Sequence, residues 1–134
     1  MRGTSSIKMA AAIGVAGIFL TASSAFAAGL KNEIAAAAQH AGLAAQGADI
    51  DTVHTHLHHT LNCLVGPDGK GFAPKEMNPC KELGKGAIPD ATDAATKASL
   101  ESEAAKAEAG IADTDLASAQ KTAAGIQTAL TAIK

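Results

Sequence analysis

The spacing of apolar residues restricts this chain to helical folds more strongly than any other feature of its sequence. Alanine, the strongest helix former, recurs through most of the chain, whereas runs of β-branched residues and strand-length alternation are missing. Near the C-terminus, steps of three and four positions link Leu116, Ala119, Ala123, Ile126, Leu130 and Ile133. The pattern predicts an all-α domain with helices at about 30–46, 51–65, 93–109 and 114–133.

The links between these helices predict how they are arranged. The first and third links are short, and short links join antiparallel neighbours. The second link, residues 66–92, contains all four prolines and opens with the strong turn signal Gly66-Pro67-Asp68-Gly69. We therefore expect an up-down-up-down four-helix bundle with one long loop between its second and third helices.

Two cysteines lie where a disulfide would pin this loop. Cys63 falls in the last turns of the second predicted helix, and Cys80 falls inside the loop. A bond between them would close a ring that the chain-entropy model credits with about 3 kcal/mol. The competing interpretation is a Cys63 thiolate bound to a metal. An oxidising compartment, which the N-terminus indicates, favours the disulfide.

The N-terminal residues have the three parts of a secretory signal. Arg2 and Lys8 precede an uncharged apolar stretch, and Ala25-Phe26-Ala27 supplies the small residues that a signal peptidase reads. We expect residues 1–27 to be removed by cleavage between Ala27 and Ala28, leaving the helical domain 28–134 in the periplasm or outside the cell. The alternative is a retained membrane anchor, whereas the cleaved chain would keep no stable span.

Charge and aromatic content argue against several kinds of partner. Without Arg2 and Lys8, nine basic and thirteen acidic residues remain, a net charge of −4. A mildly acidic domain lacks the basic patch that nucleic acids require. Trp and Tyr are absent, and Phe72 is the one aromatic residue of the domain 28–134. Stacking platforms for bases or sugars are therefore not expected.

Histidines are the chemically distinctive residues, since four of the five fall within six positions of the second predicted helix. His54 and His58 are four apart and share one edge of its apolar stripe, whereas His56 and His59 lie toward the other edge. His40 in the first predicted helix is the fifth. We expect a Cu, Zn or Ni site built from His54 and His58 with His40, or from His56 with His59. The loop offers further ligands in Asp68, Glu76 and Met77.

Other roles for the histidines stay open at this stage. Helix surfaces tolerate histidine, so the cluster could be a solvated face or could sense acid through mutual repulsion. A haem held by His40 and a histidine of the second helix is less favoured. The chain has no C-x-x-C-H motif, and it has almost no aromatic residues to line a porphyrin pocket.

No pattern in the sequence predicts an enzyme. The nucleophile elbow G-x-S-x-G, the phosphate-binding P-loop and the H-E-x-x-H motif are missing. A metal-centred enzyme is a minor alternative. The main alternative to metal binding is an interaction module in which loop 66–89, with Phe72 and Met77, binds a protein partner of the cell envelope. Phe72 could equally cover the end of the bundle, and the sequence leaves the oligomeric state open.

Overall fold

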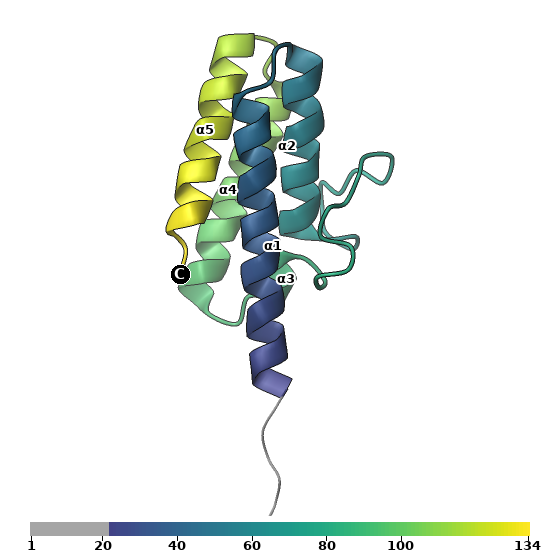
Figure 1. Cartoon of the computed structure of the whole chain (residues 1–134), viewed down its shortest axis with the longest axis vertical. Coiled ribbons are helices and arrows are strands. Elements are labelled where there is room, and N and C mark those ends of the chain that lie inside the picture. The colour runs from purple at the N-terminus through teal and green to yellow at the C-terminus, as the bar shows by residue number, and fades with distance from the viewer. Residues whose placement is uncertain (1–21) are drawn as a thin grey trace, which may run out of the picture.

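The computed structural model describes residues 22–134, and every regular element in this range is a helix (Figure 1). The expected all-α class is confirmed. The five helices are α1 (Ala22–Ala45), α2 (Ile50–Val65), α3 (Ala87–Asp90), α4 (Ala94–Ala112) and α5 (Leu116–Ala132). Most of the predicted signal peptide lies outside the described residues, and the expected cleavage point between Ala27 and Ala28 lies within α1. No helix in the described part of the chain is long and apolar enough to cross a membrane.

Three long helices begin with an aspartate cap. The carboxylate of the capping residue accepts a hydrogen bond from a backbone N–H in the first turn, which is otherwise without a helical partner. The pairs are Asp49 with Thr52 in α2, Asp93 with Thr96 in α4, and Asp115 with Ser118 in α5. The prediction that the last helix starts at about residue 114 is wrong by two positions, because Asp115 is the cap.

Two further boundaries differ from the sequence prediction. The expected loop 66–92 contains the short helix α3, whose Pro89 lies inside its single turn, where a missing N–H costs nothing. Helix α4 continues past Gly110 to Ala112, although Gly110 resembles a stop signal. This glycine is buried, and a Cβ there would lie 2.8 Å from Cδ1 of Leu57, so its role is close helix packing.

The four long helices lie side by side, and each contacts two main neighbours (Figure 1). Helix α1 packs against α2 and α5, while α4 packs against the same two helices from the other side. Fully buried alanines of α1, among them Ala37 and Ala41, face a core whose larger side chains include Leu57, Leu64 and Leu100. Small residues let α1 approach its neighbours closely, which brings its polar side chains within reach of α2.

The segment after α2 is held against the helices by covalent and polar bonds. The expected disulfide between Cys63 and Cys80 is present. Asn62 makes three hydrogen bonds to the same segment: its Nδ2 donates to the carbonyls of Ala73 and Met77, and its Oδ1 accepts from the N–H of Ala73. At the end of α2, Gly66 adopts a φ of 71°, and a Cβ there would overlap the carbonyl of Lys85. Residues 66–86 therefore fold back onto the end of α2.

Candidate metal centre

The packing of α1 on α2 decides which histidines meet. Helix α1 lies over the edge of α2 that carries His56 and His59, as shown by Thr60, whose hydroxyl donates to the carbonyl of Ala37 at 3.3 Å. His40 is three residues beyond Ala37 on α1. It therefore projects toward His56 and His59 and not toward the opposite edge of α2.

His40, His56 and His59 form one compact group, which we call the three-histidine cluster. One ring nitrogen of each lies within 4.8 Å of the others. The ring centroids are 5.0 Å apart for His40 and His59, 5.4 Å for His56 and His59, and 5.5 Å for His40 and His56. The Nδ1 atoms of His40 and His56 approach to 3.3 Å.

These distances fit a tetrahedral transition-metal site. Two nitrogens bound at about 2.0–2.1 Å to a tetrahedral zinc lie roughly 3.3–3.4 Å apart. The separation of the His40 and His56 nitrogens already has this value. The third nitrogen, on His59, lies within 4.8 Å of both.

Burial keeps the cluster in the form that binds cations. Burial, together with repulsion from His59 and His56, lowers the pKa of His40 to about 4. The pKa of His59 is also lowered, chiefly by burial, although the nearby Glu76 opposes the shift. At neutral pH both rings are uncharged and offer a lone pair. The Nδ1 of His59 is buried and has no hydrogen-bond partner.

A carboxylate lies next to the cluster. Oε2 of Glu76 is 3.9 Å from Nε2 of His59, and the Glu76 side chain is 36% exposed. The turn that carries it is held by Asn62, because the N–H of Glu76 donates to the carbonyl of Ala73, the residue that Asn62 clamps. Glu76 is thus positioned beside His59 by α2 itself, next to the three ligand atoms that converge within 4.8 Å.

His54 and His58 lie outside this group. Nε2 of His54 donates to the carbonyl of Asp113 at 2.7 Å, which ties α2 to the end of α4. His58 is partly buried, and its Nδ1 has no partner. The expected combination of His40 with His54 and His58 does not match the structure, because α1 packs on the other edge of α2.

The remaining predicted site residues have distinct surroundings. Cys63 and Cys80 are bonded to each other, so neither is a thiolate ligand in this state. Phe72 is half-buried, whereas Met77 is 59% exposed. Of the two loop residues named for partner binding, only Met77 therefore presents most of its side chain to solvent.

Three polar residues that sequence reasoning did not single out are fully buried, namely Glu33, Thr60 and Asn62. Asn62 clamps the loop, and Glu33 in α1 accepts a hydrogen bond from the N–H of Gly86 at 2.8 Å. Burial, together with the neighbouring carboxylate of Asp90, raises the pKa of Glu33 to about 7, although the hydrogen bond from Gly86 opposes the shift. The four-residue spacing of Glu33, Ala37 and Ala41 was the available signal, since it places Glu33 on the buried stripe of α1.

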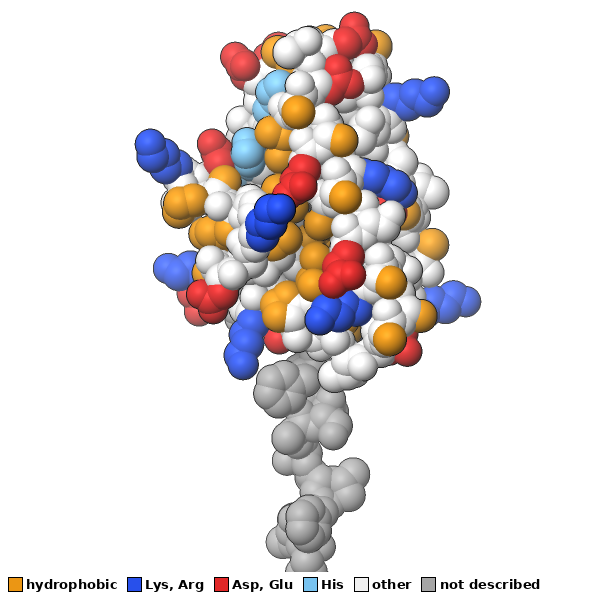
Figure 2. Space-filling view, turned by 180° about the vertical axis from the view of Figure 1, so that it is seen from behind, with side chains coloured by type: hydrophobic (Ala, Val, Ile, Leu, Met, Phe, Trp, Pro, Cys, Tyr) orange, Lys and Arg blue, Asp and Glu red, His pale blue; other side chains and the backbone are white. Residues whose placement is uncertain are grey.

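Figure 2 shows the molecule from the opposite side to Figure 1, with acidic and basic side chains interspersed over this face and histidine side chains reaching the surface. Neither acidic nor basic side chains gather into a patch on this face, in line with the expected lack of a basic patch.

No protein-family model, characterised protein or solved structure matches this chain. The assignment of a function therefore rests on the geometry of the three-histidine cluster.

Proposed function

We propose that this protein binds one transition-metal ion through His40, His56 and His59. The observation that carries the proposal is the convergence of three ring nitrogens, from two helices, to within 4.8 Å of one another. The rings of this cluster would repel one another if charged, and in the neutral form a hydrogen bond between the Nδ1 atoms of His40 and His56 at 3.3 Å holds two of them together without a metal. The low pKa of His40 supports a site kept ready for a cation at neutral pH.

The ligand set favours borderline metals. Imidazole nitrogen suits Zn, Cu and Ni, whereas Mg and Ca prefer oxygen ligands. Glu76 supplies the fourth ligand in this proposal, which would close the coordination sphere as in structural and storage sites. A closed sphere leaves no position for a substrate, so we propose buffering, carriage or sensing of the metal and not catalysis.

The proposed setting is the cell envelope or the extracellular space. The tripartite N-terminal pattern and the Cys63–Cys80 disulfide both fit an exported protein. We further interpret the four long helices as an up-down-up-down bundle, supported by the short links 46–49 and 113–115. In such a bundle the metal would join the first helix to the second.

A calorimetric titration of the disulfide-bonded protein with Zn, Cu and Ni tests the proposal. We expect one ion per chain with a micromolar or tighter Kd, and at least a hundredfold weaker binding in His56→Ala. His54→Ala is the matched control, since it removes a histidine of the same helix outside the cluster. Millimolar binding, or equal loss in both variants, would contradict the assignment.

The haem alternative has less support from the geometry. A haem iron held by two histidines separates their rings by the full porphyrin plane. The 3.3 Å between the Nδ1 atoms of His40 and His56 leaves no such space.

The interaction-module alternative is favoured by one observation, the 59% exposure of Met77 on the clamped loop. It predicts that Met77→Ala weakens partner binding while metal affinity stays unchanged.

A further inference from the structure

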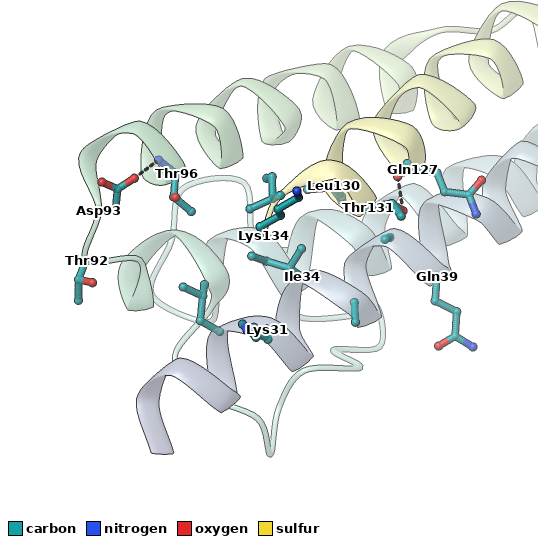
Figure 3. Close-up of a pocket in the computed structure, with 14 residues that line it drawn as sticks. Lys31, Ile34, Gln39, Thr92, Asp93, Thr96, Gln127, Leu130, Thr131 and Lys134 are labelled. Atoms are coloured by element: carbon teal, nitrogen blue, oxygen red, sulfur yellow. Dashed lines mark hydrogen bonds between the residues drawn. The ribbon is translucent and has the colours of Figure 1, made fainter. Parts of the chain in front are cut away.

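A groove of about 870 Å³ runs between α1 and α5 (Figure 3). Helix α1 lines this groove and also carries His40, but no histidine of the three-histidine cluster lines the groove. Ile34 and Leu130 are buried beneath it, and Leu30 and Ile133 are partly exposed along it. Thr92, in the link before α4, lies at one edge of the lining (Figure 3). The volume lies within the range of small-molecule sites.

Small side chains on α1 give the groove its depth. Ala35 and Ala38 both line it, and Ala35 is exposed to solvent. Larger residues at these positions would fill the space between α1 and α5. The lining is mainly apolar, with polar groups gathered at the two ends, which is the pattern expected for a ligand that has a hydrocarbon body.

The two ends of the groove differ in charge. Lys31 and Lys134 lie at one end, while the amide side chains of Gln39 and Gln127 lie at the other (Figure 3). Neither lysine is in an ion pair with any described residue. The carboxylate of Asp93, which caps α4 by accepting from the N–H of Thr96 at 2.7 Å, also lines the groove and keeps its negative charge, so at this end two lysines face one aspartate.

A protein partner fits this surface less well than a small ligand. Protein interfaces rely on large aromatic and aliphatic side chains. Among the described side chains, the large hydrophobic residues with high exposure are Leu43 and Met77, and neither lines the groove. The groove therefore lacks the protruding apolar anchors of a protein interface.

We propose that this groove binds a medium-chain fatty acid, with its hydrocarbon chain over Ile34 and Leu130 and its carboxylate between Lys31 and Lys134. The distance along α1 from Lys31 to Gln39 is about 12 Å at 1.5 Å per residue, enough for a single chain of medium length. The site is independent of metal binding, because its lining residues and the three-histidine cluster share no side chain.

Displacement of a fluorescent apolar probe by octanoate, decanoate and dodecanoate tests the proposal on the full disulfide-bonded chain. We expect the Kd to fall with chain length by up to about fourfold per added methylene, the factor expected for burying a CH₂ group. Dodecyltrimethylammonium has the same chain with a cationic head, and we expect it to bind at least tenfold more weakly than dodecanoate. Equal binding of the two amphiphiles, or no binding of either, would overturn the proposal.

Two tryptophan variants locate the binding. Ala35→Trp fills the groove from an exposed position on α1, so the fold is retained and the affinity for dodecanoate should drop at least tenfold. Ala105→Trp places the same side chain at an exposed position of α4 and should leave the affinity unchanged. Dodecanoate binding that survives in Ala35→Trp places the ligand elsewhere. If the protein does not bind dodecanoate but forms a dimer that Ala35→Trp disrupts, a second copy of the chain covers the groove. That result also overturns the proposal.

Discussion

Glu33 and His40 lie two turns apart on α1, and burial displaces their pKa values in opposite directions. Burial raises the pKa of Glu33 from 4.5 to about 7 and lowers that of His40 from 6.5 to about 4. In both cases the uncharged form is favoured in the folded protein. As pH rises from 4.5 to 6.5, the shifted pKa of His40 increases the free energy of unfolding, whereas the shifted pKa of Glu33 decreases it. The contribution of each residue is therefore best measured in a variant in which the other residue cannot ionise.

The stability that depends on His40 should decline in acid. Between pH 6.5 and 4 the unfolded chain binds a proton at His40 that the folded chain does not, so the free energy of unfolding falls as pH falls. In the Glu33→Gln background without metal, we expect a loss on the order of 2 kcal/mol across this window. Urea unfolding at several pH values measures it. If the further change His40→Gln leaves the pH dependence just as steep, His40 is not its source.

Glu33 should produce the reverse dependence. As pH rises from 4.5 to 7, the unfolded carboxyl loses its proton while the folded one keeps it, so the free energy of unfolding falls and stays low above pH 7. Glu33→Gln keeps an acceptor for the N–H of Gly86 without the ionisable group. We expect this variant to exceed the natural protein in stability at pH 8 by on the order of 2 kcal/mol, and to match it near pH 4. A variant less stable at pH 8 would contradict the raised pKa.

At the scale of elements, the disulfide and the Asn62 clamp hold one irregular segment in place. The ring closed by Cys63 and Cys80 has a sequence separation of 17 residues. Changing both cysteines to alanine should lower the free energy of unfolding by about 3 kcal/mol, because the unfolded chain regains the freedom of an open loop. Urea unfolding with and without a reductant checks this.

The natural protein in reductant serves as the control for the double cysteine variant, since it should unfold at the same urea concentration as that variant. The variant itself should not respond to the reductant. If its unfolding midpoint equals that of the oxidised natural protein, hydrogen bonds from Asn62 alone hold the loop.

Much of the element structure could be predicted from sequence, with errors that have local causes. Helix α2 and the disulfide follow from apolar spacing and from the positions of two cysteines. The short helix α3 was missed because four residues with a proline give no periodicity. Helix α4 runs past its predicted end at residue 109 because Gly110 packs against Leu57, a contact between two helices that a single segment does not reveal.

Only part of the candidate metal site could be predicted from the sequence, because the rest depends on a contact between two helices. Helical geometry separates His54 and His58 from His56 and His59, and it does so correctly. It cannot say which edge of α2 the first helix covers, because the apolar stripe of α2 is flanked by histidines on both sides. That choice depends on how α1 packs, and the contacts of Thr60 with Ala37 and of His40 with His56 reveal it.

At the scale of the whole molecule, alanine sets the distances between helices. Ala37, Ala41 and Ala44 of α1 are completely buried. These residues have no side chain long enough to fill a gap, so α1 packs through its backbone surface. The positions of the three-histidine cluster and of the groove beside α5 both depend on this close approach.

Enlarging one of these alanines should therefore disturb the entire arrangement. Ala41→Leu adds three carbons to a filled space, and we expect a loss of about 1–3 kcal/mol in the free energy of unfolding. Ala105→Leu, at an exposed position of α4, is the matched control and should change stability by less than about 0.5 kcal/mol. Thermal unfolding of both variants compares them. Equal, small effects would mean that α1 is loosely packed.

The three histidines and the disulfide all come from the N-terminal part of the chain, with His40 and His56 only 16 residues apart. Contacts so close in sequence require little loop closure and can form early in folding. The disulfide requires an oxidising compartment, so for an exported chain this assembly would take place after export. We expect the α1–α2 hairpin to form its disulfide and histidine cluster first, with α4 and α5 packing later against a centre that is already in place.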